Sequence, residues 1–313
     1  MKEEIVIEVE NLRVDFENVV ACKNVNFKVY KGEIFGLVGP NGAGKTTTLK
    51  VLSTLLKYTW GKIKIFGYDI EKDFKEIRKI VGFMPDFPPV YNELKVWEFL
   101  YLYASSYRIE KEKRMSRIEA LLNTFNLFEK RNSFIGELSR GMKQRLILAK
   151  TLIHDPEILL LDEPASGLDP TGRKELGEML KKIGKSGKTV IISSHILTEL
   201  ADFCTSVGIM EKGEILLYGK IDEISGIPKD KTLIRLRIKE NIDLKEILGD
   251  YQKIEKIEKI EGNCWKILIK GDENSIPELI KFVTDKGISI VEIKKEKEDI
   301  QTIYFKSGAK YVT

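Results

Sequence analysis

One stretch decides the fold of this chain: Gly39-Pro40-Asn41-Gly42-Ala43-Gly44-Lys45-Thr46-Thr47. It fits the phosphate-loop pattern G-x-x-x-x-G-K-S/T, whose glycines let backbone N–H groups converge on phosphate oxygens. An apolar run, 34–38, precedes it and reads as a buried strand, and leucines at helical spacing follow it over 46–57. A helix start adds N–H donors and a partial positive charge. The stretch therefore predicts a nucleoside-phosphate site, with Lys45 on the β- and γ-phosphates and Thr46 or its neighbour on Mg²⁺.

Composition indicates a globular protein of one large domain or two unequal ones. Of the 313 residues 42% are hydrophobic, which is enough for a core. The sequence has no run of 18 apolar residues, the length that could span a bilayer, and we expect no secretory signal. The net charge of +4 is spread over interspersed acids and bases, which gives no support to nucleic-acid binding. The cysteines, Cys22, Cys204 and Cys264, lack metal spacing and are expected to be buried thiols in a reducing cytosol.

The remaining pattern of the first two-thirds predicts an α/β domain. Short alternating strands and buried parallel strands are expected at 5–9, 25–29, 62–66, 80–83, 158–161 and 189–193, with a closing hairpin over 207–218. Further helices are expected over 114–126, from Ser139 to about Asp155, and over 171–183.

Polar side chains follow two of the buried strands. Asp162 and Glu163 end the first, and His195 comes just past the second. Burying carboxylates at the end of a strand costs free energy, so their presence there indicates a function. Ligands of open α/β sheets bind at that edge of the sheet. Asp162 can hold Mg²⁺ through a water, and Glu163 can orient and deprotonate a water. A solvated acidic turn is the alternative.

Two aromatic features stay open on sequence grounds. Phe16 lies between the first strands and reads, from spacing alone, as an ordinary core residue. A proline-rich loop, 84–89, leads into a stretch with six aromatic residues: Tyr91, Trp97, Phe99, Tyr101, Tyr103 and Tyr107. One helix face cannot bury all of them, so they predict either a contact surface or the packing of a small helical subdomain.

A second domain is expected where helical and strand density falls, between Gly219 and Asp230, which gives domains of 1–225 and 226–313. Its pattern is strand 232–239, helix 244–248, strands 254–260 and 264–270, helix 276–285 and strand 288–293. This is the β-α-β-β-α-β order of ferredoxin-like domains, although 254–260 fits a helix as well. Without histidine or converging acids, this domain is expected to be regulatory or to serve dimerisation.

Several segments in this order strongly resemble the ATP-binding subunit of an ABC transporter: Gly39–Thr47, Leu138–Gln144, Ile158–Pro164, Ser166–Asp169 and His195. They match its Walker A, signature, Walker B, D-loop and switch-histidine motifs over about residues 4–220. The resemblance implies a P-loop NTPase fold, a mixed sheet with a helical subdomain. It implies two subunits clamped head to tail around two ATP molecules, in which each site adds the partner's signature residues, Ser139, Arg140, Gly141 and Met142, to the phosphate loop.

The resemblance also implies a role for each site residue. Lys45 would stabilise the transferring phosphate, Glu163 would be the general base, and His195 would hold the γ-phosphate and attacking water. Thr46 and Asp162 would serve Mg²⁺. Phe16 matches the family's adenine-stacking aromatic, usually Tyr, and keeps its stacking face.

The chain departs from the family at two places. Asp86 stands where the family usually has Gln, and its carboxylate can still approach Mg²⁺ or water. The signature, usually Leu-Ser-Gly-Gly-Gln, reads Leu138 to Met142 with Arg140 adding a charge near the phosphates and Met142 unable to donate a hydrogen bond. Both are compatible with the branch that looks like drug, antibiotic or lipid exporters, which often carries a small domain after the ATPase.

The expected function is therefore an ATP-hydrolysing subunit, cytoplasmic and peripheral on the membrane's inner face, that powers export through a separate integral membrane permease. The alternative is a soluble ABC ATPase acting on DNA or ribosomes. Chromosome-type members insert a long coiled coil between the positions of Lys45 and Asp162, which this sequence lacks, and ribosomal members fuse two ATPase domains. A catalytically silent regulator would lack a base or histidine, and Glu163 and His195 are present.

Overall fold

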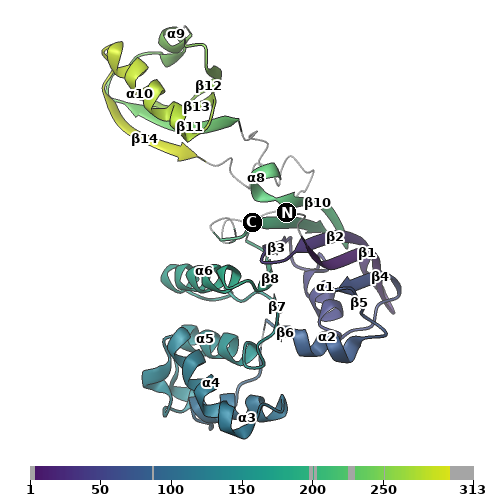
Figure 1. Ribbon diagram of the computed structural model, residues 1–313. Helices are drawn as coiled ribbons and strands as arrows, with labels where there is room; N and C mark the ends of the chain where they lie inside the picture. The colour runs from purple at the N-terminus through teal and green to yellow at the C-terminus, as the bar shows by residue number, and fades with distance from the viewer. Residues whose placement is uncertain are drawn as a thin grey trace. The chain divides into compact units, whose positions relative to one another are not determined.

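The computed structural model describes residues 4–86, 88–196, 200, 203–224, 230–249 and 251–296 (Figure 1). The chain divides into two compact units between Gly219 and Lys220. The predicted boundary between positions 225 and 226 lies outside the described residues.

The first unit is built on one mixed sheet with the strand order β5-β4-β1-β2-β10-β9-β3-β8-β7-β6. One half, from β9 to β6, is parallel, whereas β1 pairs antiparallel with β2 and β4, and β4 with β5. The strand bounds are β1 Ile5–Phe16, β2 Val19–Tyr30, β3 Ile34–Val38, β4 Trp60–Ile65, β5 Tyr68–Asp69, β6 Val81–Met84, β7 Ile158–Leu161, β8 Thr189–Ser194, β9 Ser206–Glu211 and β10 Glu214–Lys220.

The strands that carry the site have apolar centres: β3 and β7 hold no polar side chain, and the polar residues of β8 stand at its two ends. Every residue of β3, β7 and β8 is buried, as expected of central parallel strands covered on both faces. Polar side chains therefore gather only where these strands end. The next residues along the chain are the phosphate loop after β3, Asp162 after β7 and His195 after β8.

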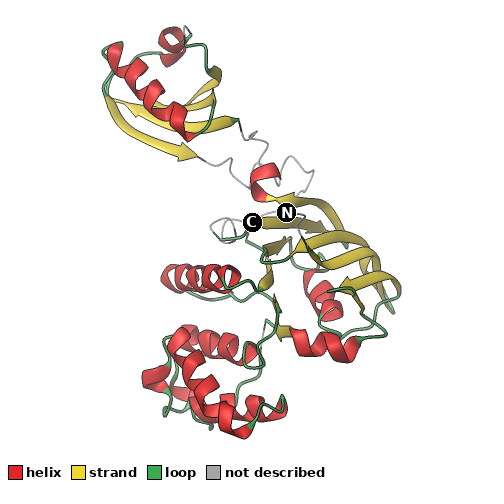
Figure 2. Ribbon diagram, viewed as in Figure 1, coloured by secondary structure: helices red, strands yellow, loops and turns green. Residues whose placement is uncertain are grey.

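Six helices of the described part belong to this unit: α1 Lys45–Leu52, α2 Phe74–Ile80, α3 Val96–Ser106, α4 Lys111–Thr124, α5 Arg140–Thr151 and α6 Pro170–Lys185. Figure 2 shows α3, α4 and α5 gathered as a helical lobe. The predicted P-loop NTPase architecture of mixed sheet and helical subdomain is thus confirmed.

Two helix predictions need correction. The helix after the phosphate loop ends at Leu52, not at 57, because Thr54 has a left-handed φ of 60° and the next leucine, Leu55, is 63% exposed. Helix α2 was not expected, since Ile77 is its one buried residue and leaves hardly any apolar period to detect.

The aromatic stretch is partly packed within the helical lobe: Phe99 is buried, whereas Tyr91 and Tyr107 are 48% and 44% exposed. Phe99 is buried with Tyr103 edge-on at 5.0 Å between ring centroids, and Trp97 packs on Tyr101 at 6.2 Å. Tyr107 stacks on His154 at 3.9 Å, and burial lowers the pKa of that imidazole to about 4. These contacts show that part of the stretch serves subdomain packing, and its exposed rings leave the contact-surface alternative open.

The second unit has the predicted β-α-β-β-α-β order after a short helix α8, Ile221–Ile224. Its strands pair antiparallel in the order β12-β13-β11-β14, and Trp265 and Leu279 lie in a core between the sheet and α10. The ambiguous stretch 254–260 belongs to a strand. The bounds are β11 Lys231–Ile238, α9 Leu244–Leu248, β12 Ile254–Glu261, β13 Cys264–Lys270, α10 Ile276–Asp285 and β14 Ile290–Glu296.

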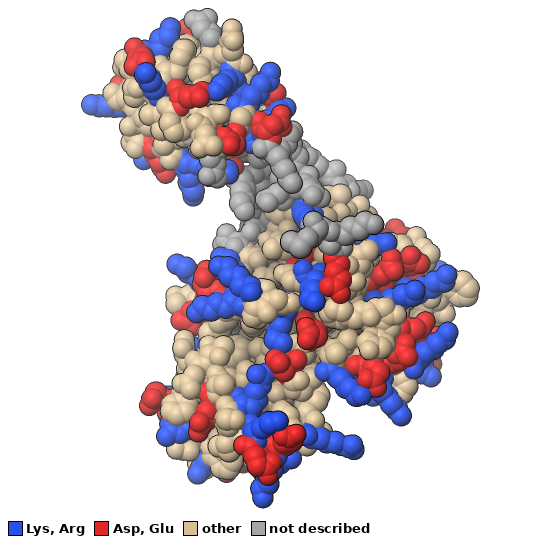
Figure 3. All heavy atoms as spheres, in the orientation of Figure 1, with Lys and Arg blue, Asp and Glu red and all other residues tan. Residues whose placement is uncertain are grey.

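The surface carries charges of both signs. On the face shown in Figure 3, basic and acidic side chains are interspersed on both units, as the sequence indicates. All three cysteines are free thiols. Among the helices that the structure describes, none combines the length and apolarity of a membrane span.

Candidate nucleotide-binding site

The phosphate loop joins β3 to α1 in a conformation that its glycines require. A Cβ on Gly39 would lie 2.0 Å from the carbonyl oxygen of Met210, and one on Gly44 would lie 2.6 Å from that of Ala21. Gly42 and Gly44 also have positive φ values of 80° and 107°. No side chain caps α1, so its first N–H groups face the loop and form an anion site.

Lys45 lies folded across this loop. Its side chain is 5% exposed, and Nζ donates hydrogen bonds to the carbonyl oxygens of Gly39 (2.7 Å) and Pro40 (3.2 Å). Burial lowers the pKa of Lys45, while the negative charges of Glu163 and Asp162 oppose that shift. The ammonium group is therefore held where phosphate oxygens would enter the loop.

Asp162 anchors the carboxylate side of the site. It is 1% exposed, and its Oδ1 accepts hydrogen bonds from Thr46 Oγ1 (3.0 Å) and Ser193 Oγ (2.6 Å). Ser193 Oγ in turn accepts a hydrogen bond from the backbone N–H of Glu163 (2.9 Å). A hydroxyl and a carboxylate oxygen side by side at the phosphate loop are the ligands that Mg²⁺ prefers.

Glu163 lies between the side chains of Lys45 and His195. Its Oε1 is 3.5 Å from Lys45 Nζ, and its Oε2 is 2.8 Å from His195 Nδ1. The residue has a left-handed φ of 46°, which is uncommon outside glycine and is typical of functional sites. The carboxylate is 13% exposed and the imidazole 41% exposed, so the histidine covers the mouth of the site. The structure thus brings together the three predicted catalytic residues.

Asp86 and Phe16 line the same cleft as the phosphate loop and Glu163. Burial raises the pKa of Asp86, and the nearby charges of Asp162 and Glu163 add to the rise. One Asp86 carboxylate oxygen is buried without a hydrogen-bond partner in the described part of the chain. Phe16 ends β1 and is 49% exposed, so its interpretation as a core residue is wrong.

The signature residues do not join this cleft within one chain. Ser139 caps α5 by accepting a hydrogen bond from the N–H of Met142 at 3.3 Å, as predicted. The Arg140 side chain donates a hydrogen bond to the carbonyl oxygen of Ser166 and none to the phosphate loop in the described residues. None of Ser139 to Met142 is among the described residues that line the cleft with the phosphate loop.

Ser193 is the site residue that sequence reasoning missed. It stands beside Asp162 because β7 and β8 pair in parallel, with Leu161 opposite Ile192. Ser193 is the first of two serines before His195, which is no recognised pattern. The available signal was its place at the end of a buried strand, next to His195.

A strand, a glycine-rich loop and a helix, with a buried lysine facing carboxylates that follow β7, two strands away in the sheet, define the class: a P-loop nucleoside triphosphatase. The ABC transporter family model matches residues 22–166. The chain is 30% identical over 302 residues to the bacitracin transport ATP-binding protein BcrA of Bacillus licheniformis, covering 96% of both chains. This protein belongs to the family of ABC transporter ATP-binding proteins.

One further relative and two solved structures cover about two-thirds of this chain. An uncharacterized ABC transporter ATP-binding protein of Nostoc, all4389, is 39% identical over 212 residues, which span 67% of this chain and 63% of that protein. The structure of cbiO1 from Clostridium perfringens, part of the transporter complex cbiONQ, has a TM-score of 0.66 and 27% identity over 71% of this chain and 91% of its own. The dimeric post-hydrolysis structure of the ATP-binding cassette MJ0796 with ADP and phosphate has a TM-score of 0.62 and 28% identity over 68% and 98%.

Proposed function

We propose that this chain binds and hydrolyses ATP as the nucleotide-binding subunit that powers export through a separate integral membrane permease, on whose cytoplasmic side it is held. The observation that carries the proposal is Glu163, held 3.5 Å from Lys45 and 2.8 Å from His195 at the phosphate loop. The name of BcrA, a bacitracin transport ATP-binding protein, supports a function in transport. The interspersed surface charges lend no support to a role on DNA or ribosomes.

Binding uses the two walls of the cleft. The adenine ring stacks on the exposed face of Phe16, and the triphosphate lies on the amides of 39–47 and the ammonium of Lys45. The oxygens of Thr46 and Asp162 fit Mg²⁺, and Asp86 presents a further carboxylate to the same cleft. Magnesium bound there would neutralise charge on the phosphates.

Hydrolysis then depends on Glu163 as general base. Its carboxylate takes a proton from a water that attacks the γ-phosphorus. The serine bond to its N–H and the bond to His195 Nδ1 fix the direction in which the carboxylate points. His195, at the mouth of the site, is placed to hold the γ-phosphate and the water.

The complete site needs a second copy or a paralogue. Because Ser139 to Met142 lie away from the cleft in one chain, we propose that they are presented to the nucleotide of the partner subunit. The dimeric structure of MJ0796 supports this arrangement. The second unit, without histidine, is proposed to be regulatory or to serve dimerisation.

The test of the hydrolytic role is Glu163→Gln, which keeps the side chain's shape and removes the base. We expect ATP binding to persist, steady-state turnover to fall at least about 100-fold, and an ATP-bound dimer to accumulate. The matched control is Glu175→Gln, a carboxylate on α6 that is 52% exposed and pairs with Arg145. Wild-type phosphate release by Glu163→Gln would remove this residue from the base role.

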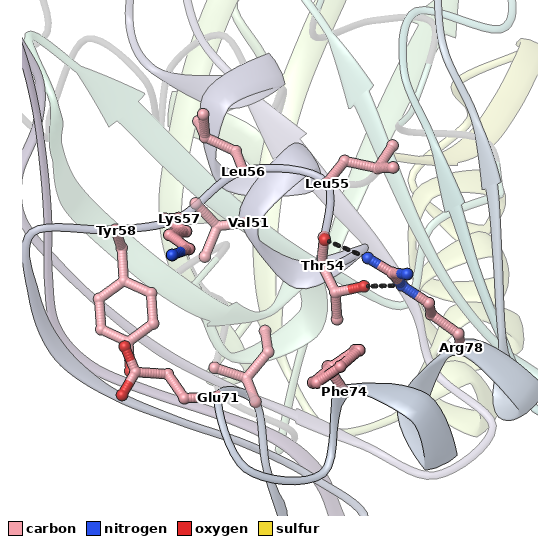
Figure 4. Close-up of a pocket in the computed structure, with 10 residues that line it drawn as sticks. Val51, Thr54, Leu55, Leu56, Lys57, Tyr58, Glu71, Phe74 and Arg78 are labelled. Atoms are coloured by element: carbon pink, nitrogen blue, oxygen red, sulfur yellow. Dashed lines mark hydrogen bonds between the residues drawn. The ribbon is translucent and has the colours of Figure 1, made fainter.

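The permease contact has two candidate surfaces. The rings of α3 are largely used within the helical lobe, whereas a hollow between the end of α1 and α2 exposes Leu55 and Phe74 (Figure 4). Beside them Arg78 Nε donates to Thr54 Oγ1 (2.6 Å) and Nη2 to the Thr54 carbonyl (3.0 Å), and no carboxylate pairs with this guanidinium in the described residues. An apolar hollow with an unneutralised cation fits a permease helix that carries an acidic residue.

Phe74→Ala and Trp97→Ala separate these two surfaces. Both variants are co-expressed with the permease subunit, and co-purification is measured. We expect Phe74→Ala to reduce it several-fold and Trp97→Ala to leave it near wild type, with the ATPase activity of the isolated chain as reference. The reverse result would place the permease contact on α3. If both variants co-purify with the membrane subunit as well as wild type does, neither surface is the contact.

A further inference from the structure

Arg140 contacts the loop that follows Glu163 in the same chain. As the first residue of α5, it donates a hydrogen bond from Nη2 to the carbonyl oxygen of Ser166 at 2.9 Å. Its guanidinium also lies flat against Gly167, since a Cβ there would be 2.0 Å from Arg140 Cζ. Gly167 has a φ of 66°, so glycine at this position provides both the backbone turn and the space for the guanidinium.

A second side chain of α5 holds the same loop. Gln144 Nε2 donates a hydrogen bond to the carbonyl oxygen of Pro164. Residues 140 and 144 are one turn apart and share a face of the helix. The carbonyls of 164 and 166 are two residues apart along the loop. One face of α5 therefore runs along 164–167 and is fastened to it at two points.

The loop is compact and starts at the proposed base. Ser166 N–H donates to the Glu163 carbonyl at 3.0 Å, and Leu168 N–H to that of Ala165 at 3.2 Å. Leu168 is 7% exposed and lies beneath Gly141, whose Cβ would be 3.9 Å from Leu168 Cδ2. The start of α5 and this loop thus form one continuous surface.

We propose that Arg140 is a positioning residue: it clamps loop 164–168 to the start of α5 and so presents both segments to the second copy's nucleotide as one rigid surface. This rests on the proposed function, because it needs a second copy. Within one chain the guanidinium contacts Ser166 and Gly167, and its expected place by the phosphates concerns the nucleotide of a second copy and stays a prediction. Glycine, the usual residue of the family's signature at this position, has no side chain with which to make this clamp.

The clamp is tested by a double-mutant cycle in the Glu163→Gln background, with ATP-driven dimerisation measured by sedimentation. Arg140→Ala should weaken the dimer about tenfold, the scale of one hydrogen bond to a charged group. Gly167→Ala should weaken it through backbone strain and by displacing the guanidinium. Combined with Arg140→Ala, only the strain remains, so the effect of Gly167→Ala should shrink at least threefold. Lys143→Ala, which removes the same charge from α5 two residues after Gly141, is the control.

Amide hydrogen exchange without ATP provides a test that needs no dimer. Arg140→Ala should speed exchange at 166–168 in the nucleotide-free chain, whereas Lys143→Ala should not. Additive effects in the cycle, or unchanged exchange, would show that Arg140 does not hold the loop and would overturn the clamp. If Glu163→Gln alone never dimerises with ATP, the proposed function fails, and the exchange result still decides the clamp. Equal thermal unfolding midpoints establish that the variants are folded.

Discussion

The two units use polar side chains on their sheets in opposite ways. In the first, Asp162 and Ser193 are 1% and 0% exposed at the strand ends and are joined by a 2.6 Å hydrogen bond. In the second, charged residues cover an exposed sheet face as pairs, such as Arg237 with Glu292 at 3.2 Å, with side chains 53% and 50% exposed. Buried polar groups carry a large desolvation cost, whereas exposed pairs cost and gain little.

This difference separates a site from a surface. A carboxylate retained at 1% exposure lowers stability unless each of its oxygens is satisfied, so its network is kept for what it does rather than for the fold. The second unit is instead stabilised by an apolar core behind the charged face, around Trp265 and Leu279. Removing a residue from each place should therefore give different kinds of loss: stability in one case and turnover in the other.

The largest change we expect sharpens this contrast from the second unit. Trp265 is 1% exposed in the core of that unit, so Trp265→Ala should lower its free energy of unfolding by about 3–5 kcal/mol. Because the two units are separately compact, ATPase activity should stay near wild type. Urea unfolding followed by circular dichroism, with ATPase assays in parallel, measures both. Trp60→Ala, at 71% exposure in the first unit, is the control. Loss of ATPase activity with Trp265→Ala would show that the two units are not independent.

Sequence reasoning succeeds where the chemistry is local. The phosphate loop and the pair Asp162 and Glu163 sit directly after an apolar strand, and His195 follows the apolar run of β8 after two serines, so the end of the hydrophobic run marks them. Ser193 escaped because its role comes from strand pairing, which puts it beside Asp162 across 31 positions. A pairing of this kind leaves no trace in spacing.

The helix errors have the same physical origin. Leu55 keeps the helical period, but it follows Thr54, which has a left-handed backbone conformation. The hydrophobic period cannot reveal where a helix ends. Helix α2 has one buried residue, Ile77, so it lacks the apolar stripe that a helical period would reveal. The clamp of Arg140 on Gly167 was likewise out of reach, because it joins two motifs that are 27 positions apart and meet only in the folded chain.

The next prediction tests the buried side of the comparison. Ser193→Ala removes a donor to Asp162 and leaves the Glu163 N–H without its acceptor. We expect turnover to fall about 10- to 100-fold, since hydrogen bonds to charged groups are worth about 1.5–3 kcal/mol, while ATP affinity falls less. Steady-state phosphate release and nucleotide titration measure the two effects.

Ser206→Ala is the matched control. Ser206 is 2% exposed on β9, and its hydroxyl has no hydrogen-bond partner among the described residues. Deleting an unsatisfied hydroxyl removes a cost rather than a bond, so turnover and stability should be unchanged or slightly higher. Equal losses in Ser193→Ala and Ser206→Ala would mean that buried serines matter here only for packing, and the first half of the comparison would fail.

The smallest effect is expected on the charged face of the second unit. Arg237→Ala should change the unfolding free energy of that unit by less than about 0.5 kcal/mol, because both side chains of the pair with Glu292 are half exposed and water replaces the partner. A double-mutant cycle with Glu292→Ala, read from urea unfolding, isolates the pair. A coupling above about 1 kcal/mol would mean that the pair is more shielded from water than its exposure indicates, since screened ion pairs do not reach that value. The face would then resemble the strand ends of the first unit, and the contrast between site and surface would have to be drawn elsewhere.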